Sequence, residues 1–443
     1  MKIQEYQSRM EEIANQDFTA SVKSGRRVDA FIKDSCLNEV HQCVATLQLP
    51  KIFTRHETAA FRKIVKTTYG IMEKVVQQYI ADREYRTLFP FSKELEQLIC
   101  TPSGYTTSVP IARLDIFYNE EDGSFKFCEI NTDGTSAMID NEVLEEALQY
   151  NNVVQKLREE EQFNTFSLFE SWVIEVGRIY ETYEKKVENP HVAIVDFLDR
   201  GHLQDFDAFM GHFQKYGYTA EVCDIRQMKY EGGSLYSQQT GRKIDIIYRR
   251  AVTADIMDRF GEVQDFIQAA LHTDVCLLGS FRTQLAHHKA FFMALHDART
   301  LQILTPQEQQ FVREHVPRTY VLDSYYKEHD IVSDRAQWII KPMDSYGSRG
   351  VYAGIDYEAQ QWQEVLDKSV GEGYLIQEYC PPYRTPNVYM MKAEPRWKMY
   401  ANMTGLFTYN GRFSGIYSRL SDGAVISSVY NEETVASLVA NGN

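Results

Sequence analysis

Four polar residues occupy two short segments whose composition is typical of β-strands. Arg113 and Asp115 lie in IARLDIFY, and Glu129 and Asn131 lie in FKFCEIN. Residues two apart on a strand project from the same face, so each segment presents its pair in one direction. Carboxylate and amide oxygens suit Mg²⁺, whereas arginine suits phosphate. These residues predict a combined metal and phosphate site.

The loop between the two segments decides whether the four side chains share one face. A three-residue loop at 121–123, with Gly123 in the left-handed conformation, places Asp115 opposite Glu129 and brings all four polar groups together. A two-residue turn at 122–123 shifts the register by one residue and separates the carboxylates. We expect the three-residue loop. The alternative is an ordinary hairpin with a solvated polar face.

Length and composition limit the class of protein. A chain of 443 residues predicts two or three domains, and 44% hydrophobic with 25% charged residues is typical of a globular protein. The net charge of -15 and the pI near 5.3 argue against a nucleic-acid partner, which requires a basic face. A nucleotide remains compatible if Mg²⁺ and local basic residues offset the charge.

The sequence also bears on location. The first residues, MKIQEYQSRMEEIANQ, lack the apolar core of a signal peptide, and the longest apolar runs are too short to span a bilayer. The seven cysteines are scattered without a CxxC pair, so we expect reduced thiols. We therefore expect a cytoplasmic protein without a membrane partner. The sequence leaves the oligomeric state open.

Periodicity and turn residues suggest three regions. Residues 1–165 are expected to form a helical N-terminal region that carries the metal-binding hairpin at 111–131, including a helix with apolar positions from Phe61 to Tyr79. Short apolar strands alternating with helices predict a small parallel α/β domain within 166–284. No GxGxxG follows its first strand, so nothing specific favours a dinucleotide.

Residues 285–443 are expected to form a nucleotide-binding region. Strands with Gly-rich turns begin near Trp338, and Asn410-Gly411 predicts a two-residue hairpin turn. Lys341 ends an apolar strand and precedes a loop that resembles a phosphate-covering flap. The candidate phosphate-binding residues of this loop are Ser345, Gly347, Ser348, Arg349 and Gly350. The loop is not a P-loop, because GxxxxGK[ST] is absent, and a plain glycine-containing turn is the alternative.

Further candidates lie at the ends of predicted elements. The strand end Gln377-Glu378-Tyr379 precedes two prolines and fits a hinge that binds adenine, although a simple strand end has the same pattern. Lys289 lies early in a helix beside two histidines, and such a lysine is often only a solvated charge. Neighbouring histidines point in different directions on a helix, so a paired metal site there is not expected.

Three arginines end predicted strands. Arg419 is placed to meet a transferring phosphoryl group, and pairing with a surface carboxylate is the alternative. Arg249 and Arg250 end a strand of the α/β unit at the edge where ligands tend to bind, so one or both are candidates for holding a substrate carboxylate. Solvated strand-end charges are equally compatible, and their role stays open.

Taken in order, these motifs resemble the circularly permuted ATP-grasp ligases, specifically the glutathionylspermidine synthetase family. The resemblance covers roughly residues 105–425 and includes Asp133, which extends an E-x-N-x-D run. It implies a mixed α+β and α/β fold of the ATP-grasp type, with a small pre-ATP-grasp α/β domain and a helical N-terminal region. In that family the R-x-D and E-x-N motifs precede the ATP-binding lysines, as they do here.

The resemblance also implies roles for individual residues. Asp115, Glu129 and Asn131 would bind one or two Mg²⁺, and Arg113 and Arg419 would be catalytic. Lys289 and Lys341 would contact the phosphates of ATP, the loop 345–350 would close over them, and Gln377, Glu378 and Tyr379 would hold adenine. The loop M-D-S-Y-G-S-R-G is longer than the usual family pattern, so the alignment of Arg349 and Gly350 is approximate.

The implied reaction joins a small-molecule carboxylate to an amine. ATP would convert the carboxylate into an acyl phosphate, and the amine would displace phosphate to form an amide, so no protein nucleophile is needed. The absence of GxSxG and HExxH agrees with this. A small-molecule kinase of the ATP-grasp type and a non-catalytic ATP-binding protein are the alternatives. The sequence identifies neither the acid nor the amine.

Overall fold

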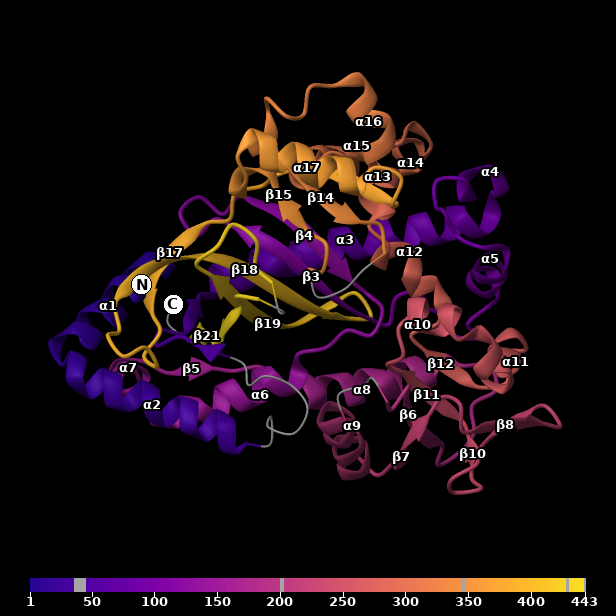
Figure 1. Ribbon diagram of the computed structural model, residues 1–443. Coiled ribbons are helices and arrows are strands. Elements are labelled where there is room, and N and C mark those ends of the chain that lie inside the picture. The colour runs from indigo at the N-terminus through magenta and orange to yellow at the C-terminus, as the bar shows by residue number, and fades with distance from the viewer. Residues whose placement is uncertain (36–44, 200–202, 345–347, 428–429, 442–443) are drawn as a thin grey trace.

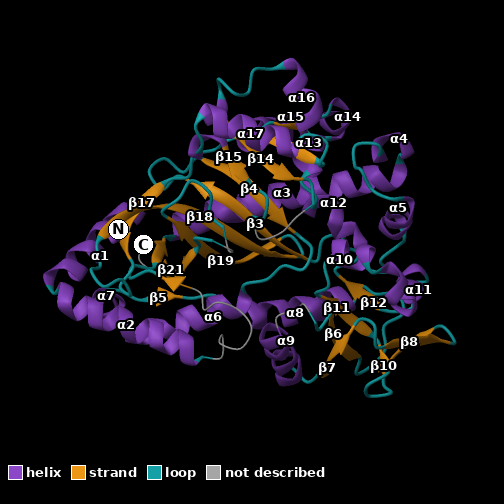
Figure 2. Ribbon diagram, viewed as in Figure 1, coloured by secondary structure: helices purple, strands orange, loops and turns teal. Residues whose placement is uncertain are grey.

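The computed structural model describes residues 1–35, 45–199, 203–344, 348–427 and 430–441. The largest sheet, here called the main sheet, has the strand order β1-β20-β19-β18-β3-β4, and β17 pairs with the first half of β18 (Figures 1 and 2). Its strands are β1 (Ala45–Thr46), β3 (Ile111–Tyr118), β4 (Phe125–Asn131), β17 (Arg384–Val388), β18 (Trp397–Tyr409), β19 (Arg412–Ser421) and β20 (Glu433–Val435). The expected hairpin thus joins strands from the far end of the chain.

The turn between β3 and β4 differs from the predicted one. The Asn119 N–H donates to the Ser124 carbonyl at 2.8 Å, so the loop comprises residues 120–123 and is one residue longer than expected. Gly123 has φ +76°, as the prediction required. Taken alone, this longer loop would shift the pairing by one residue and place the two carboxylates on opposite faces.

A β-bulge restores the predicted pairing. Ile116 pairs with Phe127 on the turn side, whereas Asp115 pairs with Glu129 beyond it, so Cys128 is the extra residue. Because of this extra residue, Asp115 and the residues of β3 before it pair with β4 residues one position later than the loop alone would give. The expected register at the polar residues is therefore confirmed, although the loop length was wrong and the bulge was not foreseen.

The two faces of the main sheet have different surroundings. Leu114, Leu406 and Ile416 project to the face covered by α3 (Arg55–Ala81) and form one hydrophobic core with residues of this helix. The predicted apolar periodicity of this segment is confirmed, and Thr54 and Glu57 form a capping box at its start. The opposite face carries the polar residues of β3 and β4.

A smaller antiparallel sheet with the order β13-β16-β14-β15 lies above this polar face, packed against helices (Figure 1). Its strands are β13 (Thr319–Val321), β14 (Trp338–Pro342), β15 (Tyr352–Ala353) and β16 (Tyr374–Glu378). The helices of this region are α12 (Gln284–His287), α13 (Ala290–His296), α14 (Ala298–Ile303), α15 (Pro306–His315), α16 (Leu322–Glu328) and α17 (Ala359–Ser369). Trp362 and Ile376 belong to the core between α17 and this sheet.

One predicted helix is interrupted. The segment after residue 284 forms α12 and α13 instead of one helix, because His288 is extended (φ −66°, ψ 131°). The His288 ring packs edge-on against Phe91, and its Nδ1 accepts the Ala290 N–H at 3.2 Å. This contact starts α13 anew and makes Lys289 its N-cap residue.

The predicted parallel α/β unit is confirmed. Its sheet has the order β12-β11-β6-β7 with all neighbours parallel. The elements are β6 (His191–Asp196), α9 (Leu203–Lys215), β7 (Thr219–Asp224), β11 (Ile246–Arg249), α10 (Thr253–Asp258), α11 (Gln264–Leu271) and β12 (Cys276–Leu278). A small antiparallel sheet follows β7, with β8 (Met228–Glu231), β9 (Ser234–Ser237) and β10 (Lys243–Ile244).

The remaining elements surround the main sheet. The helices are α1 (Ile3–Gln16), α2 (Phe18–Asp34), α4 (Arg83–Arg86), α5 (Lys93–Cys100), α6 (Met138–Ala147), α7 (Asn152–Glu160) and α8 (Leu168–Tyr180). Strands β2 (Lys51–Phe53), β21 (Ser437–Ala440) and β5 (Phe163–Asn164) form another sheet. The two-residue turn at Asn410-Gly411 is confirmed, with φ +47° and +74°. Within the described ranges, no helix has both the length and the apolar character to cross a membrane.

Candidate active site

Arg113, Asp115, Glu129, Asn131 and Arg419 form one connected group, which we call the open cluster. Arg113 donates to both oxygens of Asp115, at 2.8 Å from Nε and 3.1 Å from Nη2. Asn131 Nδ2 donates to Asp115 at 2.8 Å and to Glu129 at 3.2 Å. Arg419 Nη2 also donates to Asp115, and lies 3.4 Å from Glu129 Oε1. The structure therefore brings together all five polar residues expected near the transferring phosphate.

The two carboxylates of the open cluster have different surroundings. The side chain of Asp115 is 0% exposed, whereas that of Glu129 is 36% exposed. Burial acts to raise the pKa of Glu129, but Arg419, Lys289 and Arg113 outweigh it and hold this pKa below its ordinary range. Glu129 is thus the ionised carboxylate that remains accessible.

Gly405 on β18 makes room for the open cluster. It pairs with Asp115, and a Cβ atom at this position would lie 2.8 Å from Asp115 Oδ1 and 2.9 Å from Arg113 Cδ. These separations are too short for a side chain, so glycine allows the carboxylate and guanidinium to cross the strand. A glycine inside a strand indicates that another group approaches the backbone closely, but the sequence does not show which group this is.

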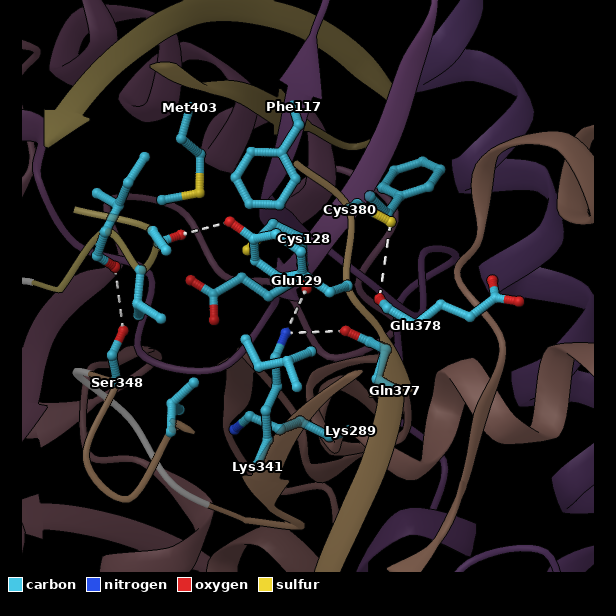
Figure 3. A pocket seen from close by; sticks show the side chains of 17 residues that line it. Phe117, Cys128, Glu129, Lys289, Lys341, Ser348, Gln377, Glu378, Cys380 and Met403 are labelled. Atoms are coloured by element: carbon cyan, nitrogen blue, oxygen red, sulfur yellow. Dashed lines mark hydrogen bonds between the residues drawn. The ribbon is translucent and has the colours of Figure 1, made fainter. Parts of the chain in front are cut away.

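A cavity lies between the polar face of the main sheet and the smaller sheet. Its walls combine apolar and charged side chains that come from β3, β4, β14, β16, β18 and the start of α13 (Figure 3). The lining includes Phe117, Glu129, Lys289, Ile339, Lys341 and Met403. Apolar walls with a few convergent charges are typical of ligand pockets.

Lys341 is held in the cavity by two acceptors. Its Nζ donates to Gln377 Oε1 at 2.9 Å and to the carbonyl of Cys128 at 3.3 Å (Figure 3). Gln377 Nε2 in turn donates to Thr319 Oγ1 at 2.9 Å. The Gln377 amide is therefore engaged at both ends, and it positions Lys341 beside the bulge of β4.

The predicted hinge residues line the same cavity. Glu378 accepts the Arg318 N–H at 2.9 Å through its side chain, and the Tyr379 hydroxyl donates to the Ala424 carbonyl at 3.3 Å. These contacts orient the side chains of Glu378 and Tyr379 toward neighbouring segments of the chain. An adenine-binding role for residues 377–379 stays a prediction.

The Gly-containing loop after β14 approaches the C-terminal part of the chain. Ser348 has φ +57°, and its hydroxyl donates to the Ile426 carbonyl at 3.3 Å. Gly350 has φ +71°, a conformation that favours glycine. Ser348 lines the cavity, whereas Arg349 is exposed.

Lys289 enters the cavity from the start of α13, and its backbone N–H lies 3.3 Å from the Met343 carbonyl. Burial lowers the pKa of this lysine, while Glu129 opposes the shift. Ser345 and Gly347, which were also expected at the phosphates, lie outside the described residues. The phosphate-binding roles of this loop and of Lys289 stay predictions.

Asp133, Asp205, Arg249 and Arg250 form a separate group, which we call the closed cluster. Arg249 lies 2.5 Å from Asp133 with its side chain 0% exposed, and it donates to the Ala251 carbonyl at 2.6 Å. Arg250 donates to Asp205 at 3.0 Å, and both side chains are 4% exposed. Neither guanidinium is open to a substrate carboxylate, so this expectation was wrong.

Glu432 was missed at the sequence level. Its carboxylate lies 3.4 Å from Arg419 Nη1 and is 11% exposed. It belongs to the segment between β19 and β20. The sequence of this segment does not indicate that the Glu432 side chain points inward. Only the folding of β20 beside β19 brings it to the open cluster.

Comparison with solved structures identifies a similar fold. A glutathione synthetase-like effector from Globodera pallida, in its apo form, aligns with a TM-score of 0.62 at 9% identity, over 94% of this chain and 96% of that one. This chain shares its fold with that effector. No family model matches the sequence, and neither does any curated protein.

Two other solved structures align less well. A protein assigned as a gamma-glutamylcysteine synthetase in Methylobacillus flagellatus KT has a TM-score of 0.46 at 10% identity, over 88% of this chain and 90% of that one. D-cycloserine synthetase has a TM-score of 0.30 at 12% identity, over 56% of this chain and 91% of that one. The expected circular permutation, the domain limits and the glutathionylspermidine synthetase family stay predictions.

Proposed function

We propose that this protein is an ATP-dependent ligase that joins a carboxylate to an amine through an acyl phosphate, releasing ADP and phosphate. The observation that carries the proposal is the convergence of Lys289, Lys341 and Glu129 in one cavity that borders the open cluster. The fold shared with a glutathione synthetase-like protein supports it. So does the resemblance of the motifs to the circularly permuted ATP-grasp enzymes of the glutathionylspermidine synthetase family.

The cavity suggests the orientation of ATP. Ile339 and Met403 supply apolar surface for the adenine ring near residues 377–379. Lys289 and Lys341 supply positive charge for the phosphates, in a chain whose net charge is -15. The γ-phosphate would then lie next to Glu129 and the two arginines of the open cluster.

The oxygen donors of the open cluster fit Mg²⁺. Glu129 faces the cavity, and Asn131 uses its amide N–H groups on the two carboxylates, which leaves its oxygen as an acceptor. Within the described ranges, no three His, Cys, Asp or Glu side chains are grouped to hold a metal. Glu129 and Asn131 would therefore hold Mg²⁺ together with the phosphates of ATP. Bound Mg²⁺ would neutralise charge on the phosphate oxygens.

Asp115 has a further task in this arrangement. Its oxygens accept from Arg113 and Arg419, so it fixes the direction of both guanidinium groups. A metal-ligand role for Asp115 would require one of these contacts to give way, and it stays a prediction.

The proposed chemistry requires positioning and charge stabilisation. An oxygen of the substrate carboxylate attacks the γ-phosphorus, and the bond to the bridging oxygen of ADP breaks. Arg113 and Arg419 stabilise charge on the transferring group. The neutral amine nitrogen then attacks the acyl carbon and loses one proton, and inorganic phosphate leaves with the former carboxylate oxygen and takes up that proton.

A screen for ADP release tests the proposal. Purified protein with Mg²⁺ and ATP is incubated with a panel of amino acids, peptides, carboxylic acids and polyamines, alone and in pairs. We expect ADP release that requires both an acid and an amine. Release with one hydroxyl acceptor and a stable phosphorylated product would indicate a kinase. Tight ATP binding without ADP release across the panel would contradict catalysis.

A further inference from the structure

A group of polar side chains lies where α12 meets the loop that follows β14. Gln284 Nε2 donates to Asp344 Oδ2 at 3.1 Å. Gln284 and His287 are three residues apart on α12, so they share one face of this helix. The Asp344 carboxylate acts to raise the pKa of His287, so the two side chains are close enough to influence each other. We call Gln284, His287 and Asp344 the acceptor cluster.

Two buried atoms of the acceptor cluster lack a hydrogen bond. In the described part of the chain, Gln284 Oε1 and His287 Nδ1 have no partner, although Gln284 is only 1% exposed. The orientation of the Gln284 amide is fixed, because its N–H group donates to a carboxylate that can only accept. Leaving a buried acceptor unpaired is unfavourable by about 1–3 kcal/mol, so Gln284 Oε1 matches a missing hydrogen-bond donor, and His287 Nδ1 can accept a second one in the tautomer that carries its proton on Nε2.

Charges of both signs surround the acceptor cluster. Burial is the largest influence on His287 and lowers its pKa, Lys289 lowers it further, and Asp133, Asp344 and Glu129 offset only part of these effects, so the ring is neutral at neutral pH. Asp133 is already paired with Arg249, whereas Asp344 accepts the neutral amide of Gln284 and is also attracted to the Lys289 ammonium.

The location connects the acceptor cluster to the cavity. Lys289, which lines the cavity, follows His287 by two residues, and its N–H lies 3.3 Å from the carbonyl of Met343, the residue before Asp344. Glu129 contributes to the electrostatic environment of His287. The cluster thus borders the position proposed for the transferring phosphate.

We propose that the acceptor cluster binds the primary ammonium group of the amine substrate. A primary ammonium carries three N–H donors and no acceptor, which matches Gln284 Oε1, His287 Nδ1 and the Asp344 carboxylate. Its positive charge is balanced by Asp344. The description of the ligand as a substrate rests on the proposed ligase function, whereas the recognition of a primary ammonium does not require turnover.

Nuclear magnetic resonance of the histidine rings tests this assignment. Protein with ¹³C-labelled histidine is titrated at neutral pH with propylammonium, in the presence of Mg²⁺ and β,γ-methylene-ATP. The His287 signal is identified by its loss in His287→Gln. We expect a saturable shift of this signal, and no shift of the exposed His56, whose side chain is 86% exposed.

Three further probes separate hydrogen bonding from charge and shape. Trimethyl(propyl)ammonium keeps the charge but has no N–H donor, propanol has the same chain without the charge, and K⁺ is a bare cation. We expect at least about tenfold weaker effects from each. An equal shift with trimethyl(propyl)ammonium or K⁺ would overturn the ammonium assignment and indicate a general cation site. No saturable shift with propylammonium would overturn it outright.

Matched variants connect the shift to the cluster. We expect Asp344→Asn and Gln284→Met each to weaken propylammonium binding by about tenfold or more, whereas Asp334→Asn, an exposed position in the same region, leaves it unchanged. Unchanged binding in Asp344→Asn would contradict the proposal. Folding of each variant is checked by its unfolding midpoint.

The titration and the ADP screen test separate claims, so either one can give a negative result while the other is positive. Propylammonium binding without any ADP release would keep the ammonium site and reject the ligase. ADP release that depends on an amine, without a propylammonium effect at His287, would keep the ligase and reject this site.

Discussion

The open and closed clusters are built from the same residue types, arginines and carboxylates, yet they differ in access. In the closed cluster, the side chains of Arg249, Asp133, Arg250 and Asp205 are all at most 4% exposed, and each carboxylate has its own arginine. In the open cluster, two arginines share Asp115, and Glu129 remains 36% exposed toward the cavity.

The difference shows what separates a structural ion pair from a candidate active site. Removing one member of a buried pair leaves an uncompensated charge, so the closed cluster is tied to stability. The open cluster keeps one ionised carboxylate and the nearby Lys341 in contact with a cavity, where they can meet a ligand. Changes in the two clusters should therefore affect different measurements.

The largest effect is expected when the closed cluster is broken. Arg249→Met should lower the free energy of unfolding by about 3–5 kcal/mol, because Asp133 stays buried without its partner. Urea unfolding at neutral pH measures the loss. Arg396→Met is the control, since the Arg396–Glu394 pair is largely exposed and should not change stability measurably. A loss below about 1 kcal/mol in Arg249→Met would remove the distinction between the clusters.

At the open cluster we expect a smaller effect in free energy, and we expect it in the rate of ADP release instead of in stability. Glu129→Gln should reduce the ADP release rate at least about a hundredfold, because it removes the accessible negative charge beside the arginines. The unfolding midpoint should change little. Glu121→Gln, in the exposed turn of the same hairpin, is the control and should retain the rate. A Glu129→Gln variant that keeps the wild-type rate, or that loses its rate only because it is unfolded, would contradict this assignment.

The smallest effect concerns Asp140, which interacts with both clusters. Burial, followed by Asp205 and Glu432, raises the pKa of Asp140 to about 7, against the opposing influence of Arg113. In the unfolded chain the group ionises at lower pH, so between that pH and about 7 the folded protein binds more protons. The free energy of unfolding should therefore fall as pH rises toward 7.

The variant Asp140→Asn isolates this contribution. We expect its stability to exceed that of the wild type by about 1–2 kcal/mol at pH 8 and to be similar at pH 5. Denaturation curves at the two pH values measure the difference. A difference that is the same at both pH values would show that Asp140 does not titrate in this range.

Local features were predictable because neighbouring residues determine them. The helix around Phe61 to Tyr79 and the Asn410-Gly411 turn follow from periodicity and from residues that tolerate positive φ. The pairing of Asp115 with Glu129 was also predicted, but the loop length was wrong and the bulge at Cys128 compensates for it. Alternation of residue types does not reveal where a strand carries an extra residue.

Long-range contacts separate the arginine that reaches the open cluster from the one that is enclosed in the closed cluster. Arg419 and Arg249 both end strands, and the sequence offers no reason to rank one above the other. Arg419 meets Asp115, 304 residues away, whereas Arg249 is enclosed by Asp133 and Ala251. Glu432 and Gly405 have no recognisable motif, because their importance depends on strands that pair only in the folded chain.

Trapping of an acyl phosphate tests the central claim most directly. The wild-type protein and Lys341→Met are incubated with Mg²⁺, ATP, hydroxylamine and the same panel of carboxylic acids, and hydroxamate and ADP are measured together. For an acid that is a substrate, we predict equal amounts of hydroxamate and ADP with the wild type. Lys341→Met should form neither, because the cavity loses the charge held by Gln377 and Cys128. ADP without hydroxamate, or equal hydroxamate from Lys341→Met, would contradict carboxylate activation in this cavity.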